Sequence, residues 1–384
     1  MKRILVAAVI LVNLFTVSHA QALCTGQVFN DVNINTVGEF FCDFIERFRG
    51  LGITGGCVGD DPLTPQNEAQ YCPGDNVTRS QMAVFVTRAI EKVTAKTLQE
   101  IALLKWYEVN QTAQFSVGTG PRGIAFDGAS IWVANSGSNN VTKLRANDGA
   151  SLGIFAVGNI PNSIAFDGAN IWVANSGTSN VTKLRANDGT SLGTFAVGNF
   201  PRGIAFDGAN IWVANFSSAN VTKLRANDGT NLGTFAVGAD PFGIAFDGAN
   251  IWVANQSSNS VTLLKASDGT NLGTFTLGLS PQGIAFDGAN IWVANADSNT
   301  VTKLRSSDGT NLGTFAVGDF PTGITFDGAN IWVTNQLSNA VTKLRASDGT
   351  NLGTFAVGSN PSGIAFDGAN IWVVNNGSDS VSKL

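Results

Sequence analysis

The sequence predicts a mainly β protein, most of which is a seven-bladed β-propeller closed by an N-terminal strand and preceded by a small disulfide-containing α-helical domain. The first observation is a repeat with a period of 40 residues, marked by Pro121, Pro161, Pro201, Pro241, Pro281, Pro321 and Pro361. The second is the content of each repeat, in which short apolar runs alternate with Asp-Gly turns. Short strands and tight turns at such a period are typical of propellers, with one four-stranded blade per repeat.

Residues 1–20 have the pattern of a signal peptide. Lys2 and Arg3 precede an apolar run, and small residues lie at the expected cleavage position. The run is shorter than the about 20 residues that span a bilayer. Its removal leaves 21 basic and 28 acidic residues, without a basic cluster. We therefore expect an exported protein, at the cell surface or in a periplasmic or extracellular space, with no transmembrane segment and no nucleic-acid partner.

Residues 21–93 differ from the repeats and contain all four cysteines. An even number of cysteines in a short exported segment predicts disulfide bonds. Three pairings are open, and short loop lengths favour Cys24–Cys42 with Cys57–Cys72. The alternative is a zinc site, which the lack of a Cys-x-x-Cys pair disfavours.

The same segment has apolar residues at helical spacing over 40–48, and Thr78 and Gln81 form a capping-box pattern at the start of a second helix. Stretches 28–32, 44–46, 51–55 and 77–83 resemble S-layer homology domains. The resemblance implies binding to envelope polysaccharide through Thr78 and Arg79, although the family's Thr-Arg-Ala-Glu signature reads Thr-Arg-Ser-Gln here. The alternative is that Thr78 caps a helix and Arg79 is a solvated charge.

Residues 94–110 are expected to form a helical connector, and residues 111–384 the propeller. In the repeat that begins at Pro201, we expect strands at 203–206, 211–214, 221–226 and 232–237, because Asp-Gly turns separate the first from the second and the third from the fourth, and residues 215–220 separate the second from the third. Both faces of each strand are apolar or small, as in sheets that pack neighbours on both sides. The Trp that recurs once per repeat, such as Trp212, is expected to pack between blades rather than stack on a ligand.

Ring closure is predicted from the two ends of the repeats. The last repeat stops after its third strand at Leu384, while Phe115 lies in a fourth-strand motif that precedes the first complete repeat. We therefore expect residues 111–118 to complete the last blade, which removes an exposed edge. The repeats also resemble YVTN/NHL-like propeller repeats. This resemblance implies the fold but no single activity, since such propellers include binding proteins, lactonases and lyases.

Two of the four links in each repeat vary between copies, namely those between strands two and three and between one blade and the next. In an up-and-down blade both emerge on the same side, which we call the variable face. The residues expected nearest the channel mouth follow each repeat proline: Arg122, Asn162, Arg202, Phe242, Gln282, Thr322 and Ser362. Arg and Phe suit a protein, peptide or glycan surface. Drift at solvated loops is the alternative explanation.

Around this ring we expect Ile160, Phe200, Asp240, Asp319 and Phe320, with Phe216, Gln256, Asp297 and Leu337 further out. Each second strand ends in Asn, as at Asn135. This Asn is expected to bond its own loop backbone, and a polar ring for sugars is the alternative. Lys143, Arg145 and their counterparts are expected to be solvated or paired with turn aspartates.

The sequence also limits the chemistry. The one histidine, His19, leaves with the signal peptide, and the repeats contain no cysteine or glutamate. This excludes histidine bases and histidine-bound metals in the mature repeats, whereas the streptogramin lyases, which are similar in fold, use a catalytic histidine. We expect a non-catalytic, monomeric envelope protein without metal or cofactor that binds polysaccharide or protein. The alternatives are a metal-dependent hydrolase or lyase using Asp240, Asp297 or Asp319, and a purely structural surface protein.

Overall fold

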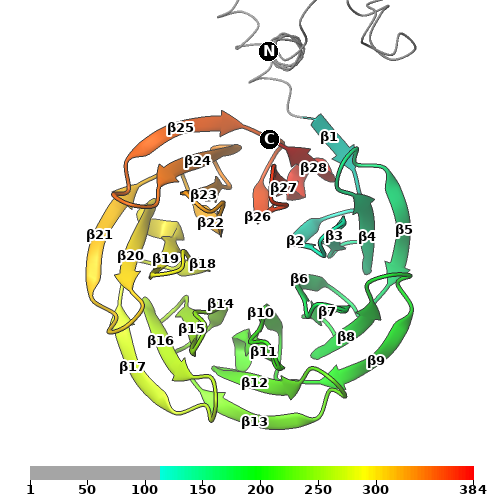
Figure 1. The fold of residues 1–384 in the computed structure, drawn as a ribbon, viewed down its shortest axis with the longest axis horizontal. Coiled ribbons are helices and arrows are strands. Elements are labelled where there is room, and N and C mark those ends of the chain that lie inside the picture. The colour runs from blue at the N-terminus through cyan, green and yellow to red at the C-terminus, as the bar shows by residue number, and fades with distance from the viewer. Residues whose placement is uncertain (1–112) are drawn as a thin grey trace, which may run out of the picture. The chain divides into compact units, whose positions relative to one another are not determined.

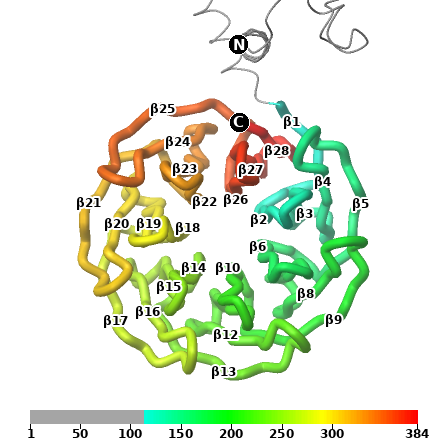
Figure 2. The backbone as a smooth tube through the Cα atoms, viewed as in Figure 1, coloured from blue at the N-terminus to red at the C-terminus, as the bar shows by residue number. Residues whose placement is uncertain are grey.

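The computed structural model describes residues 113–384 as a closed ring of seven antiparallel four-stranded sheets. Figures 1 and 2 show the sheets arranged radially, so that the first strand of every blade faces the central channel and the fourth lies at the perimeter. The predicted seven-bladed propeller is confirmed. The predictions for residues 1–112, namely the signal peptide, the disulfide-containing helical domain and the connector, lie outside the described residues.

The first, channel-side strands are β2 Pro121–Phe126, β6 Pro161–Phe166, β10 Pro201–Phe206, β14 Pro241–Phe246, β18 Pro281–Phe286, β22 Pro321–Phe326 and β26 Pro361–Phe366. The second strands are β3 Ser130–Asn135, β7 Asn170–Asn175, β11 Asn210–Asn215, β15 Asn250–Asn255, β19 Asn290–Asn295, β23 Asn330–Asn335 and β27 Ile371–Asn375. Three-residue 3-10 turns follow three of them: η1 Phe216–Ser218, η2 Ala296–Ser298 and η3 Asn376–Ser378. Among residues 113–384, no helix has the length and apolarity to cross a membrane.

The third strands are β4 Asn140–Arg145, β8 Asn180–Arg185, β12 Asn220–Arg225, β16 Ser260–Lys265, β20 Thr300–Arg305, β24 Ala340–Arg345 and β28 Ser380–Lys383. The fourth strands are β5 Ser151–Ala156, β9 Ser191–Ala196, β13 Asn231–Ala236, β17 Asn271–Thr276, β21 Asn311–Ala316, β25 Asn351–Ala356 and, for the last blade, β1 Ala113–Ser116. Each first strand starts at the repeat proline, two residues before the expected start. Proline is accepted there because it is the first residue of its strand.

The ring closes as predicted. β1 pairs antiparallel with β28, with Phe115 opposite Val381. The Phe115 ring lies 5.5 Å from the ring of Trp372, which matches the Phe–Trp spacing inside other blades. Because β1 occupies the edge of β28, the last blade has four strands like the rest.

The turn between the first and second strands is organised by its aspartate. Asp207 accepts hydrogen bonds from the backbone N–H groups of Ala209 and Asn210, and from the indole Nε1 of Trp212 at 2.7 Å. The repeated Phe-Asp-Gly-Ala-Asn sequence therefore fixes both the turn and the orientation of the tryptophan. Gly208 has a φ of +96°, a conformation that glycine adopts without steric cost.

The core lies between blades. Trp172 is fully buried and packs with Ile204, Ile211 and Leu224 of the next blade. Equivalent clusters join every neighbouring pair, including the last blade and the first. This confirms the expected packing role of the repeated tryptophans, with the indole N–H bonded to the turn aspartate rather than directed to the channel.

The expectation for the repeated lysines is wrong. Lys183 is buried, and its ammonium donates to the backbone carbonyls of Ala226 and Asn227 in the next blade, at 2.7 and 3.0 Å. It also lies 4.9 Å from the centre of the Trp172 ring. The lysine therefore joins adjacent blades. The arginines do pair with turn aspartates as predicted, as in Arg185–Asp188 at 3.1 Å.

Candidate functional site

The two variable links of each blade lie side by side. The backbone N–H of Ser136, in the link after β3, donates to the carbonyl of Gly120, in the link before β2. Gln256 and Asp240 make the same contact in another blade, at 3.0 Å. Since these links carry the differences between repeats, sequence diversity is concentrated on the variable face, around one end of the channel.

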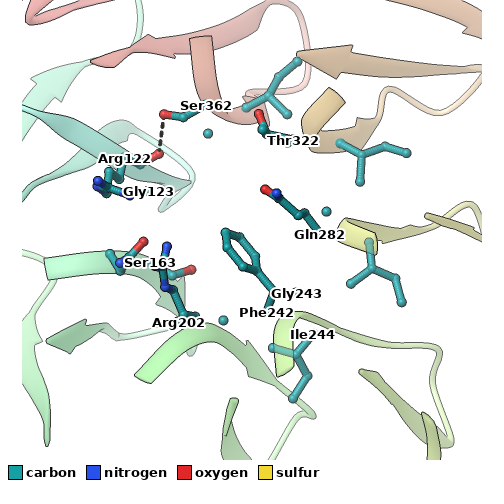
Figure 3. A pocket seen from close by; sticks show the side chains of 18 of the residues that line it. Arg122, Gly123, Ser163, Arg202, Phe242, Gly243, Ile244, Gln282, Thr322 and Ser362 are labelled. Carbon is teal, nitrogen blue, oxygen red and sulfur yellow. Dashed lines mark hydrogen bonds between the residues drawn. The ribbon is translucent and has the colours of Figure 1, made fainter. Parts of the chain in front are cut away.

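All seven residues that follow the repeat prolines line one pocket at that end of the channel, with a volume of about 400 Å³. The lining includes residues from the channel-side strand of every blade, and Figure 3 shows Phe242 and Gln282 extending toward the middle of the opening. This volume lies within the range typical of small-molecule sites, roughly 300–1,000 Å³. The structure thus brings the predicted ring together, and its role in binding stays a prediction.

Of the other residues predicted to lie around the channel mouth, some line the pocket and others do not. Phe320 and Gln256 line the pocket, and Gln336 joins them without having been predicted. Ile160, Phe200, Asp240, Asp319, Phe216, Asp297 and Leu337 are not part of the lining. Gln336 follows the Asn that ends its second strand, as Gln256 does. Aligning the repeats would therefore have predicted Gln336 together with Gln256.

Ser163 is a second lining residue that sequence reasoning missed. The other six blades have glycine at this position. At Gly243 an added Cβ would lie 2.1 Å from the carbonyl oxygen of Gln282, so neighbouring inner strands approach too closely there for a side chain. Ser163 is the one residue at this position that has a side chain, and its strand lies beside the strand that carries Arg202. The presence of serine where every other repeat has glycine was the sequence signal that could have identified this lining residue.

Arg202 has the most unusual environment in the pocket. Its guanidinium carbon lies 5.0–5.1 Å from the centres of three phenylalanine rings, those of Phe200, Phe216 and Phe242. Such cation–π contacts stabilise a guanidinium without supplying a hydrogen-bond acceptor. The buried Nε of Arg202 has no hydrogen-bond partner within residues 113–384. Burial, and secondarily the charge of Arg122, lower the pKa of Arg202 to about 10.

Apart from Arg202 and Arg122 the lining is uncharged, and it combines polar side chains with isoleucine, phenylalanine and glycine. The Nε of Arg122 donates to the hydroxyl of Ser136 at 3.2 Å. Ser362 donates to the backbone carbonyl of Arg122, the contact dashed in Figure 3. The Gln282 side chain is only 4% exposed, and its amide has no hydrogen bond with any described residue. Arginine and amide donors therefore converge on one cavity.

The carboxylates proposed for a metal are separate from one another. Asp240 accepts a hydrogen bond from Ser257, Asp297 accepts one from Ser280, and Asp319 accepts one from Asn299. Within residues 113–384, no three His, Cys, Asp or Glu side chains are grouped as metal ligands would be.

The repeated Asn at the end of each second strand is not a sugar-binding ring. Asn135 is fully buried, and its Nδ2 donates to the side chains of Asn140 and Thr142 on the adjacent third strand. The expected bond to its own loop backbone is therefore wrong, although its role is structural. Thr78, Arg79 and the four cysteines Cys24, Cys42, Cys57 and Cys72 lie outside the described residues.

No protein-family model matches the chain, and no curated protein matches it. Solved structures are similar in fold. A streptogramin B lyase is 20% identical, with a TM-score of 0.61 over 70% of this chain and 95% of that chain. Hydrazine synthase of Kuenenia stuttgartiensis is 17% identical, with a TM-score of 0.63 over 71% and 97%. Virginiamycin B lyase from Staphylococcus aureus is 18% identical, with a TM-score of 0.61 over 71% and 98%. At these identities the likeness shows the β-propeller fold alone.

Proposed function

We propose that this protein is an exported, non-catalytic component of the cell envelope whose propeller binds a protein or glycan partner through the variable face. The observation that carries this proposal is the division of the molecule into two unlike faces. One face consists of near-identical turns, and the other gathers seven side chains of six kinds around one pocket. Binding and catalytic residues tend to lie on variable loops held by a rigid scaffold.

The chemistry of the pocket favours binding over catalysis. The lining holds arginine, glutamine, asparagine, serine, threonine, phenylalanine, isoleucine and glycine, and no Asp, Glu, His, Cys or Lys. It therefore lacks the usual general bases and the usual ligands of a divalent metal. Two structural neighbours are lyases. Their likeness extends to the fold, so a lyase reaction at this site has no support from the residues present.

The N-terminal segment enters the proposal only through its sequence. Its resemblance to S-layer homology domains supports attachment of the chain to envelope polysaccharide, with Thr78 and Arg79 as the contacting residues. The signal-peptide pattern supports export. The YVTN/NHL-like repeats are consistent with a surface-exposed binding propeller.

The proposal is tested by presenting the full-length protein to arrays of glycans and purified envelope proteins. We expect a ligand whose binding falls at least tenfold in Phe242→Ser, which alters the pocket. Leu232→Ser, on the outer strand β13, is the matched control and should bind normally. If no ligand binds, the purely structural alternative is favoured. If both variants bind equally well, the ligand does not use the pocket and the proposed binding site is wrong.

A further inference from the structure

We propose that the pocket at the channel mouth binds an oxyanion group, a carboxylate or a phosphate, between the guanidinium groups of Arg202 and Arg122. The inference rests on the proposed function, because it names the chemical group that a ligand would insert into the same pocket. Carboxylates and phosphates present paired oxygens that match the fork of N–H donors on a guanidinium.

The first support is the unpaired charge of Arg202. The three phenylalanine rings hold its guanidinium in place, yet the structure gives it no carboxylate and no hydrogen bond among residues 113–384. A buried donor without an acceptor costs free energy, and a buried charge costs more. An oxyanion in the pocket would remove both costs, because it supplies acceptors and an opposite charge.

The second support is the sign of the charge within the pocket. Two arginines line it and no acidic residue does, although the whole chain has a net charge of −5. Arg122 is close enough to Arg202 for its charge to affect it. Two like charges at one mouth repel each other and attract an anion, and the low-dielectric walls strengthen both effects.

The third support comes from the opposite wall. Gln282 is only 4% exposed, and its side chain points toward the middle of the pocket in Figure 3. Its amide lacks a partner among the described residues, so two N–H donors are free to reach an oxygen held by the arginines. Phe242 lies between Gln282 and Arg202 and offers an apolar surface for the body of the ligand. Donors on two sides and an aromatic face between them describe a site for a small acidic group.

The test is isothermal titration calorimetry of the full-length protein at low ionic strength. Three probes are used: inorganic phosphate, D-glucuronate and uncharged D-glucose. The variants are Arg202→Met, which fills the phenylalanine cage without charge, and Arg122→Gln, which alters a more exposed side chain. The control is Arg225→Gln, which removes an exposed arginine paired with Asp228 on the uniform face.

We expect phosphate or glucuronate to bind at least tenfold more tightly than glucose, and to bind more weakly as salt is added. Each pocket variant should weaken anion binding at least tenfold, while Arg225→Gln leaves it unchanged. The stronger of the two anions identifies the group, whether phosphate or carboxylate. Without anion, the melting temperature of Arg202→Met should equal or exceed that of the unchanged protein, because an unpaired buried charge has been removed.

Equal affinity for the three probes, or anion binding that survives both pocket variants, would overturn the inference. If Arg202→Met does not fold, the inference is judged by whether Arg122→Gln alone weakens anion binding. The inference fails separately from the proposed function if an array ligand depends on Phe242 but binds Arg202→Met and Arg122→Gln normally. If anion binding needs the arginines and no array ligand is found, the inference is supported and the proposed protein or glycan partner is rejected.

Discussion

At the scale of single residues, the repeated aspartate of the first turn links backbone and core. Asp207 accepts hydrogen bonds from Ala209, Asn210 and Trp212, the last of which is a fully buried tryptophan. In Asp207→Ala the indole N–H of Trp212 loses its acceptor, which typically costs about 1–3 kcal/mol. We expect a fall of at least about 2 kcal/mol in the free energy of unfolding, measured with urea. Asp228→Ala, on an exposed turn, should cause a clearly smaller fall, and equal falls would contradict this role.

The aspartates also predict how stability depends on pH. The backbone N–H and hydroxyl of Thr190, together with Arg185, lower the pKa of Asp188 to about 2, below its unfolded value of about 3.9. Burial acts to raise the pKa of Asp207, but the hydrogen bonds from Trp212 and its neighbours outweigh it and leave that pKa lowered. A lowered pKa stabilises the fold above about pH 4, and this stabilisation is lost as the pH falls toward 2.

We therefore expect the melting temperature to change little between pH 7 and pH 5 and to fall below pH 4. Scanning calorimetry across this range provides the measurement. Replacing Asp188 and Asp228 with asparagine should make the acid fall shallower, because fewer groups take up protons on unfolding. A melting temperature that rises on acidification would contradict the assignment.

At the scale of elements, the junctions between blades depend on a lysine that reaches across. Lys183 on β8 donates to two carbonyls of the next blade, whereas the fourth blade has the buried Leu263 at the equivalent position. One junction of this ring is therefore already packed by a leucine in place of the lysine. Lys183→Leu should cost little, roughly 1 kcal/mol, because it reproduces that packing. Lys183→Ala should cost about 2–3 kcal/mol, because it leaves a void in addition to the unpaired carbonyls that both variants share.

Urea unfolding of both variants measures this difference. Arg185→Ala, on the same strand but with an exposed ion pair, is the control and should change stability least. If Lys183→Leu and Lys183→Ala are equally destabilised, the junction depends on the ammonium group itself and not on filled volume.

The strands were predictable because their signals are local: two of the four connections in each complete repeat contain Asp-Gly, and each strand has its own apolar run. The roles of Lys183 and Asn135 were not, since their partners lie on the next blade or the adjacent strand. The ring of pocket residues could be predicted because all seven occupy the same position of the repeat, directly after its proline. The cage around Arg202 could not, because Phe200, Phe216 and Phe242 come from two links and a neighbouring blade, and only the folded ring brings them together.

At the scale of the whole molecule, the ring depends on one junction unlike the others. In six blades the fourth strand follows the third through a short turn, but β1 joins β28 through hydrogen bonds and packing alone. Phe115→Ala and Phe235→Ala remove the same contact, a ring 5.5 Å from a tryptophan, from the closing blade and from an internal blade. The packing loss is therefore matched, and the difference between them isolates closure.

We expect Phe115→Ala to have the lower melting temperature, by a further 2 °C or more, because a detached β1 frees a whole strand whereas β13 stays tethered by its turn. Loss of β1 also exposes the edge of β28, and exposed edges pair with other chains. Size-exclusion chromatography with light scattering should therefore show concentration-dependent self-association of Phe115→Ala and not of Phe235→Ala. If the two variants melt together and both remain unassociated, β1 contributes no more than an ordinary fourth strand, and the ring is held by its inter-blade core.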